Sequence, residues 1–513
     1  MVLTTIFLYI APMRSCFILT LIILLSGCEL GTDPATRVSP NYNLLGACEP
    51  SDNAYVAAVV AESLCGTIAV FENRETQRGR KVELNVMVLP AVSSVVKPDP
   101  IFLLAGGPGQ SAVDVGPFLF SRLRVLRQER DVVLVDQRGT GESNSLKCDL
   151  DESEFDLLGL SIDEAMDMQV DALRACLADY DADPTLYTTS IAMDDLNEVR
   201  EILGYRDINL IGISYGTRAG QVYLRRHEDS VRTLTIDAVV PMDVAIPENV
   251  ALDAQAAFDA LVADCTNQPA CNAAFPELRE QFNAVVDKLK QPDQQLAISH
   301  PRTGEVATTS MAPQLISRLI RSILYDRNLS RLVPLAITEA NKGNFQILTT
   351  IAYAFTGDSM NMSTGMMMSV LCAEDMIRRP AEKVTPEFDN PMLEVLDRVC
   401  PFWPTGTIPE DFDIPVTSDK PVLVTSGVLD PITPPRYGEM VAQHLSNAEH
   451  IIVAGVGHGT LTSGCMPDIL ADFIETADPK ALDTTCSTNL SRPPFFTSFA
   501  GPVLELNEQE ANP

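Results

Sequence analysis

Basic residues are scarce in this sequence of 513 residues. It holds 37 Lys and Arg against 69 Asp and Glu, which gives a formal net charge of −32. Such an acidic chain repels phosphate backbones, so we expect no nucleic-acid binding and no electrostatic attachment to an anionic membrane surface. The charge is compatible with a cationic substrate, but an acidic surface that keeps the protein soluble explains it equally well.

Metal-binding motifs are also missing. The 12 cysteines form no Cys-x-x-Cys pair, and the chain contains no His-Glu-x-x-His and no zinc-ligand spacing. We therefore expect no metal and no cofactor. Methionines cluster at positions 360, 362 and 366–368. Clustered thioethers can bind Cu(I), but methionines more often line adaptable apolar surfaces, and we favour that interpretation.

The N-terminal hydrophobic run, residues 17–25, is too short to span a bilayer by itself. It follows Arg14 and ends in Leu-Ser-Gly-Cys at residues 25–28, which resembles a bacterial lipoprotein signal. We therefore expect a signal peptide over residues 1–27, a lipid anchor on Cys28 and a place in the bacterial cell envelope. An uncleaved membrane helix and a plain secretory peptide are the alternatives. Initiation at Met13 would give a more usual signal length than initiation at Met1.

Without Cys16 and Cys28, ten cysteines remain, an even number in an exported chain. This favours disulfides over metal ligation, although sequence cannot fix their connectivity. We expect pairs between neighbours in the sequence, with buried free thiols as the alternative. The expected pairs are Cys48–Cys65, Cys148–Cys176, Cys265–Cys271, Cys372–Cys400 and Cys465–Cys486.

The most informative motif is Gly-Ile-Ser-Tyr-Gly at residues 212–216, directly after the apolar run 208–211. A strand that leads into Gly-x-Ser-x-Gly and continues as a helix, here residues 217–224, is typical of a nucleophile elbow. Its strained turn exposes the serine hydroxyl. Ser214 is therefore the expected nucleophile, and a turn of small residues without chemistry is the alternative.

A serine nucleophile needs a base and a carboxylate, which the motif predicts in the chain order Ser, Asp or Glu, then His. Of the five histidines, His458 alone lies in a glycine loop after a strand-like run, residues 451–454. Asp430 follows the expected strand 421–426 and begins a rigid proline turn, so it is the expected carboxylate. Asp237 is the rival, but its position before a long insert better fits the anchor of a turn.

An oxyanion hole needs two backbone N–H groups. One is expected from Tyr215, after the nucleophile, and the other from the loop 105–111. Because Pro108 has no N–H, we expect Gly107 to donate. The loop also fits a dinucleotide fingerprint loosely. We reject that interpretation because a Gly-Pro pair at 116–117 should interrupt the helix that it requires.

Strand-like and helical segments alternate along the chain, which predicts a mostly parallel sheet with helices on both faces. Strands become scarce between residues 246 and 415, and helical periodicity there indicates an inserted cap. The expected strands include residues 67–70, 82–89, 101–104, 132–135, 208–211, 234–236, 421–426 and 451–454. The expected organisation is a tether over residues 28–50, a sheet domain over 51–245 and 416–490, a helical cap over 246–415 and a loose tail over 491–513.

Together these residues resemble the tripeptidyl and prolyl aminopeptidase branch of the α/β-hydrolases, from about residue 65 to residue 486. The resemblance implies an α/β-hydrolase fold with a helical cap, and a serine exopeptidase that acts on short peptides with a free N-terminus. Ala105 stands where prolyl aminopeptidases usually carry His, which speaks against strict proline specificity. The resemblance rests on Cys-Gly-Thr at 65–67, Gly-Gly-Pro-Gly at 106–109, Asp-Gln-Arg-Gly-Thr-Gly at 136–141, Cys-Ala-Glu-Asp at 372–375, Cys-Pro-Phe-Trp-Pro at 400–404 and Gly-Cys-Met-Pro at 464–467.

In this family Ser214 would attack the carbonyl, His458 would carry the proton and Asp430 would orient His458. Adjacent acids such as Glu374 and Asp375 usually form a solvated face. If one points into the site, it could hold the ammonium group of a substrate, and Glu374 is the first choice. Two other functions stay open: an esterase or amidase that uses the same residues on small acyl substrates, and a non-catalytic lipoprotein that binds a ligand.

Overall fold

The computed structural model describes residues 40–148, 162–291, 294–300, 303–309, 311–356, 362–379, 388 and 390–503. The expected signal peptide and Cys28 lie outside these residues, and so does Met360. Within the described ranges, no helix combines the length and the apolar character needed to cross a membrane.

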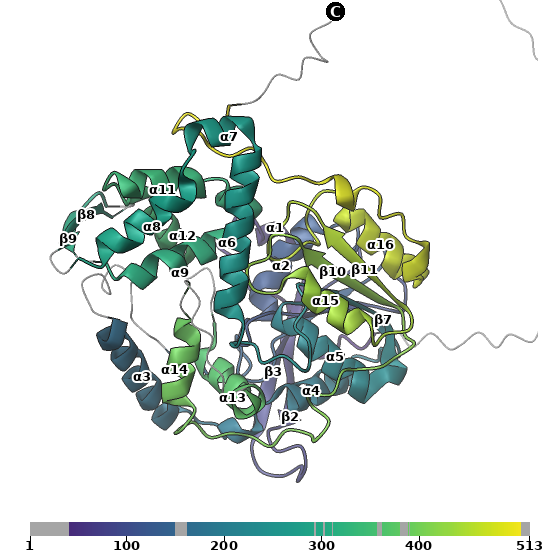
Figure 1. Ribbon diagram of the computed structural model, residues 1–513. Coiled ribbons are helices and arrows are strands. Elements are labelled where there is room, and N and C mark those ends of the chain that lie inside the picture. Colours follow the sequence, from purple (N-terminus) through teal and green to yellow (C-terminus); the bar gives the residue numbers. More distant parts are fainter. Residues whose placement is uncertain are drawn as a thin grey trace, which may run out of the picture. The chain divides into compact units, whose positions relative to one another are not determined.

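A nine-stranded sheet is the main element of the described chain (Figure 1). The strands from β5 to β11 in spatial order are parallel, whereas β1, β2 and β3 run antiparallel to their neighbours. The mostly parallel sheet that the alternating pattern predicts is thus confirmed. In spatial order the strands are β1 (Gly46–Ala47), β2 (Leu64–Phe71), β3 (Lys81–Leu89), β5 (Val132–Val135), β4 (Ile101–Leu104), β6 (Ile208–Ile213), β7 (Val231–Asp237), β10 (Val422–Gly427) and β11 (Ala448–Val453).

Helices cover both faces of the sheet because successive side chains of a strand point to opposite sides. On β4, Phe102 and Leu104 belong to one hydrophobic core, whereas Ile101 and Leu103 belong to another. The helices that contribute to the first core include α4 (Thr189–Ile202), α5 (Tyr215–His227) and α15 (Pro435–Ala442). Those of the second are α1 (Ala57–Ala61), α2 (Ala112–Arg122) and α16 (Met466–Thr476).

Helix α2 corrects one expectation, because it runs through Gly116 and Pro117 without interruption. The helix tolerates Pro117 in its interior although proline removes one N–H bond. A Cβ on Gly116 would lie 2.4 Å from the Leu134 side chain, so glycine permits close packing on β5. A broken helix is therefore no argument against a dinucleotide site. That hypothesis fails for another reason: the Asp136 carboxylate accepts the N–H of Val113 at 3.0 Å, where a pyrophosphate would bind.

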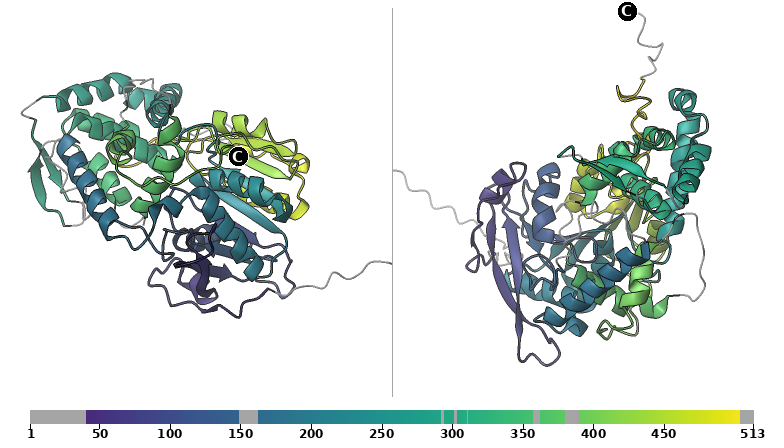
Figure 2. Two further views of the ribbon diagram at one scale, coloured as in Figure 1. Left: turned by 90° about the horizontal axis from the view of Figure 1, so that it is seen from below. Right: turned by 90° about the vertical axis from the view of Figure 1, so that its left-hand side faces the viewer.

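The helices between β7 and β10 form two groups rather than the single cap that the sequence predicts (Figures 1 and 2). The first group has its own core, which contains Phe258, Phe282 and Phe388. In the second group, α13 (Thr364–Glu374) and α14 (Pro391–Val399) pack with α3 (Ile162–Asp179), which the sequence places in the sheet domain. The first group comprises α6 (Val250–Asn267), α7 (Pro269–Ala274), α8 (Leu278–Leu289), the hairpin of β8 (Leu296–Ser299) and β9 (Val306–Thr309), α9 (Pro313–Leu324), α10 (Arg327–Ser330), α11 (Val333–Asn341) and α12 (Gln346–Thr356).

Both ends of the described chain are packed, where the sequence predicts a tether and a loose tail. In the expected tether, β1 pairs with β2, and the hydroxyls of Tyr42 and Tyr205 lie 2.6 Å apart. In the expected tail, Phe495 is 2% exposed and belongs to the core of the first cap group. Aromatic side chains contribute to the packing of each end, and composition and periodicity do not reveal these contacts.

All five expected disulfides are present in the described residues. Cys372–Cys400 connects α13 with the end of α14, and Cys465–Cys486 connects the start of α16 with the short 3-10 helix η6 (Ser487–Asn489). The prediction that cysteines pair with their neighbours in the sequence is confirmed, because each disulfide joins two segments that are close along the chain. The other short 3-10 helices are η1 (Pro184–Leu186), η2 (Glu228–Ser230), η4 (Met376–Arg378) and η5 (Pro479–Ala481).

Candidate active site

Ser214 occupies the sharp turn between β6 and α5. Its φ of 58° and ψ of −126° are rare for a residue with a side chain. The turn closes because its two glycines lack side chains: a Cβ on Gly212 would lie 2.3 Å from the Gly216 carbonyl oxygen, and a Cβ on Gly216 would lie 2.0 Å from that of Leu104. The backbone is therefore strained at the residue that the motif identifies as a nucleophile.

His458 and Asp430 form a hydrogen bond at the same edge of the sheet. His458 Nδ1 lies 2.9 Å from Asp430 Oδ2, and the two residues follow the neighbouring parallel strands β11 and β10. Asp430 also accepts the N–H groups of Ile432 and Thr433, each at 2.9 Å, and the Thr433 hydroxyl at 2.7 Å. Sequence reasoning missed Thr433, although a hydroxyl three residues after an Asp in a proline turn is a recognisable signal.

Burial opposes the charge on both members of this pair, and their mutual attraction outweighs it. Burial lowers the pKa of His458, but the charge of Asp430 and its hydrogen bond raise that pKa above the ordinary value for histidine. Burial raises the pKa of Asp430, but the charge and hydrogen bond of His458 lower it below the ordinary value. Asp430 is therefore ionised at neutral pH, and its negative charge stabilises the protonated form of His458. A general base needs this stabilisation once it has accepted a proton.

Asp237 connects the turn of Ser214 with the loop of His458. Its carbonyl accepts the Ser214 N–H at 3.0 Å, and its carboxylate accepts the N–H of Thr460 at 2.7 Å and the Thr425 hydroxyl at 2.9 Å. Thr460 lies two residues after His458. Asp237 thus anchors turns on both sides of the site, and Asp430 is the carboxylate that contacts His458.

Backbone N–H groups next to Ser214 are candidates for binding an oxyanion. Tyr215 is the first residue of α5, and the first N–H groups of a helix have no partner within it. In the loop after β4, the N–H of Gly106 donates to Gln110 Oε1 at 3.2 Å, which leaves Gly107 as the better candidate. The loop lies against the nucleophile, because a Cβ on Gly106 would be 3.3 Å from Ser214 Cβ.

Glu374 is fully buried, contrary to a solvated face. Its carboxylate accepts the N–H of Thr189 at 2.6 Å and the Thr189 hydroxyl at 2.7 Å. The same hydroxyl lies 2.7 Å from that of Tyr215. Burial raises the pKa of Glu374 to about 7, against the two bonds from Thr189. In this conformation Glu374 supports the residue after the nucleophile and is closed to a substrate ammonium.

Asp375 is likewise fully buried and bound within the protein. It pairs with Arg218 of α5 at 2.8 Å and accepts the N–H of Ile246 at 2.8 Å. These contacts join the end of α13, the helix after the nucleophile and the chain segment that enters the first cap group. They give Asp375 a structural role in this conformation, and substrate binding by either acid stays a prediction.

Met362 and Met366 of the methionine cluster contact the loop after β4 and the hydrophobic core, respectively. Met366 and Met368 are 1% and 2% exposed, and a Cβ on Gly107 would lie 2.8 Å from the Met362 methyl group. This placement fits the apolar lining that we favour over a copper site. A cavity of about 250 Å³ lies beside the same loop, with Ile213 and Thr462 among its walls.

The family of the chain follows from comparison with known proteins. Residues 99–463 match the family model described as alpha/beta hydrolase fold, and the chain therefore belongs to the α/β-hydrolase family. The serine protease Hip1 of Mycobacterium tuberculosis is 24% identical over 425 residues, which cover 75% of this chain and 79% of that protein. The tripeptidyl aminopeptidase of Streptomyces coelicolor is 26% identical over 431 residues, 76% of each protein.

A solved structure of a proline iminopeptidase from Mycobacterium smegmatis aligns with a TM-score of 0.40 and 16% identity, over 81% of this chain and 100% of that one. The family model shows a hydrolase of the α/β class, and the two relatives named above carry names for peptidase activity.

Proposed function

We propose that this protein is a serine exopeptidase that hydrolyses peptide bonds near the free N-terminus of short peptides. The observation that carries the proposal is the arrangement at one sheet edge of a strained Ser214 and a hydrogen-bonded His458–Asp430 pair, joined through Asp237. The names of the relatives, a serine protease and a tripeptidyl aminopeptidase, support peptides as the substrate class.

In the proposed mechanism, Ser214 Oγ attacks the peptide carbonyl while His458 Nε2 takes its proton. The N–H groups of Tyr215 and Gly107 stabilise the resulting oxyanion. His458 then protonates the leaving amine, and an acyl-enzyme forms on Ser214. Water activated by the same histidine hydrolyses this ester and restores the enzyme. Asp430 keeps the imidazole in one tautomer throughout.

Restriction to free N-termini requires a group that binds the substrate ammonium, and we propose Glu374 for this role. Binding would require its carboxylate to exchange a bond from Thr189 for one from the substrate. Glu374→Ala should then raise KM for free peptides far more than for N-blocked esters. Equal effects on both substrates would contradict the role and favour purely internal support.

An esterase or amidase for small acyl substrates is the second candidate. The internal bonding of Glu374 and Asp375 favours it, because both acids are engaged within the protein in this conformation. Such an enzyme would use the same three residues without recognising an amine.

The deciding experiment measures initial rates on chromogenic aminoacyl and tripeptidyl amides with free and with blocked N-termini, with Ser214→Ala as the control. Turnover of free-amine substrates alone, abolished in Ser214→Ala, supports the exopeptidase. Turnover of blocked substrates or esters alone supports the second candidate. A wild-type protein that turns over none of these and does not react with a fluorophosphonate probe contradicts both and favours a ligand-binding protein.

We also propose that Cys28 carries a lipid and places the enzyme in the bacterial cell envelope. The motif Leu-Ser-Gly-Cys after a short hydrophobic run supports this. Metabolic labelling with an alkyne fatty acid should mark the wild-type protein and leave Cys28→Ser unlabelled. An unlabelled wild type would contradict the anchor.

A further inference from the structure

The loop that carries His458 is held from outside the sheet domain. The backbone N–H of His458 donates to the carbonyl of Tyr325 at 3.0 Å. The Tyr325 and His458 rings are also neighbours, with centroids 4.9 Å apart and planes inclined by 60°. The backbones of Gly457 and Tyr325 are also in close contact, because a Cβ on Gly457 would lie 2.6 Å from the Tyr325 carbonyl oxygen. Tyr325 ends helix α9 of the first cap group. The cap therefore contacts both the backbone and the ring of the proposed base.

The segment 491–496, which we call the C-terminal strap, holds the same turn of the cap. Helix α10 begins two residues after Tyr325, and its Arg327 donates to the Ser491 carbonyl at 2.7 Å. Arg492 of the strap is 8% exposed and donates to the Ser330 hydroxyl of α10 at 2.7 Å. The strap thus contacts both ends of the short helix that follows Tyr325.

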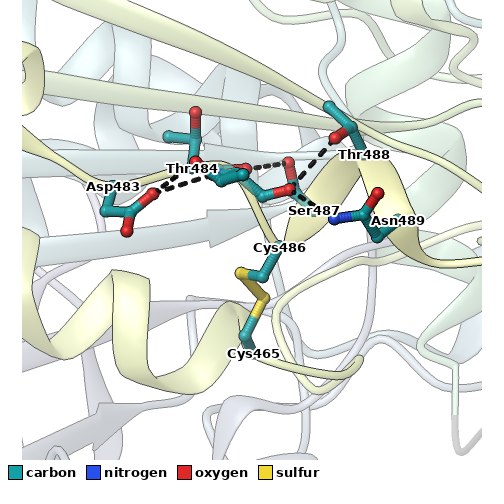
Figure 3. Close-up of a disulfide and its surroundings, with 8 residues drawn as sticks. Cys465, Asp483, Thr484, Cys486, Ser487, Thr488 and Asn489 are labelled. Atoms are coloured by element: carbon teal, nitrogen blue, oxygen red, sulfur yellow. Dashed lines mark hydrogen bonds between the residues drawn. A yellow bond between two sulfur atoms is a disulfide. The ribbon is translucent and has the colours of Figure 1, made fainter.

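The other end of the strap contacts the loop of His458. Cys486, bonded to Cys465 at the start of α16, fixes the chain just before the strap begins (Figure 3). The strap then passes Gly455, the first glycine of that loop, so closely that a Cβ there would lie 2.3 Å from the Ser491 carbonyl carbon. The loop, the cap turn and the strap therefore form one contiguous set of contacts.

We propose that Tyr325 is a positioning residue for His458, and that the C-terminal strap fixes the position of Tyr325. The inference rests on the proposed function, since it takes His458 as the catalytic base. Asp430 bonds the imidazole at one atom, Nδ1, about which the ring can still swing. The tilted Tyr325 ring beside the imidazole and the Tyr325 carbonyl on the His458 backbone limit that freedom. Nε2 is then held in reach of the serine proton and of the leaving group.

The test compares Tyr325→Ala with Tyr325→Phe on two esters that share one acyl group. One ester releases a nitrophenol, which leaves with little help, and the other releases a simple alcohol, which His458 must protonate. Values of kcat/KM report the acylation step for both, and a loss of folded protein lowers both equally, so it cancels in their ratio. Tyr55→Ala is the control variant, because Tyr55 is 85% exposed.

We expect Tyr325→Ala to lower kcat/KM for the alcohol ester at least about ten-fold more than for the nitrophenyl ester. Tyr325→Phe and Tyr55→Ala should keep the wild-type ratio. Arg492→Gln, which loosens the strap while the ring remains, should shift the ratio in the same direction as Tyr325→Ala. An unchanged ratio in Tyr325→Ala overturns the positioning role, and an unchanged ratio in Arg492→Gln overturns the role of the strap. A wild type that hydrolyses neither ester and resists a fluorophosphonate probe refutes the proposed function itself.

Discussion

Replacing Asp375 by alanine should destabilise the protein strongly, because the buried Arg218 would lose the carboxylate with which it forms its ion pair. Both side chains are 0% exposed, and Arg218 reaches no other carboxylate among the described residues. Removing one member of a buried ion pair costs about 3–5 kcal/mol. The same change in Asp163, which is 81% exposed and pairs with Arg398, should cost about 1 kcal/mol at most.

Urea unfolding of the two variants tests this difference. The single tryptophan, Trp403, is a suitable reporter because it is 3% exposed and its N–H donates to the hydroxyl of Ser369 in α13, the helix that precedes Asp375. With a denaturant slope of about 3 kcal/mol per M, the midpoint of Asp375→Ala should fall by about 1–1.7 M. Midpoints of the two variants within about 0.3 M of each other would refute the reasoning. A raised KM with an unchanged midpoint would instead restore Asp375 as a substrate ligand.

Further predictions concern the site and its supports. The acid limb of kcat/KM should lie above about pH 6.5, because Asp430 raises the pKa of His458 against burial and only the neutral base accepts a proton; a limb below about pH 6 would contradict this. Asp430→Asn should lower kcat by about 10⁴-fold and move the limb to lower pH, and a limb that stays in place would argue against the pairing. Gly216→Ala should abolish folded, active protein, since its Cβ would lie 2.0 Å from a backbone oxygen, and wild-type activity would contradict that geometry. Removing Cys465–Cys486, with a sequence separation of 21, should cost about 1 kcal/mol more in thermal unfolding than removing Cys265–Cys271, with a separation of 6. Equal losses of unfolding free energy in the two variants would show that the entropy of the unfolded chain is not the main source of the stabilisation by these disulfides.

The sequence predicts well those residues whose role follows from a local pattern. Ser214, Asp430 and His458 each follow an apolar run that forms a parallel strand, and parallel strands end at one edge, so the three turns meet there. The structure brings Asp430 to His458 as the chain order implies. The catalytic roles of these residues stay predictions until activity is measured.

Prediction from the sequence fails where a contact between residues distant in the chain determines the environment of a side chain. Glu374 and Asp375 resemble an exposed acidic pair, but both are buried, and their shortest side-chain contacts are with Thr189 and Arg218, which are distant in sequence. Tyr325 has no pattern that would mark it, because it contacts His458 across the boundary between cap and sheet domain. Likewise, nothing in the composition of residues 491–503 reveals that Phe495 packs into the core of the first cap group.

The pairing of β7 with β10 has a consequence for the order in which the protein becomes active. Leu234 and Val422 are register partners, so the sheet stays incomplete until the whole inserted region has been synthesised. The nucleophile belongs to the part that is made first, and the acid and base belong to the part that is made last. A nascent chain therefore carries a serine without its base. Under the proposed mechanism, hydrolysis can therefore begin only after the C-terminal part of the chain, which carries Asp430 and His458, has been made.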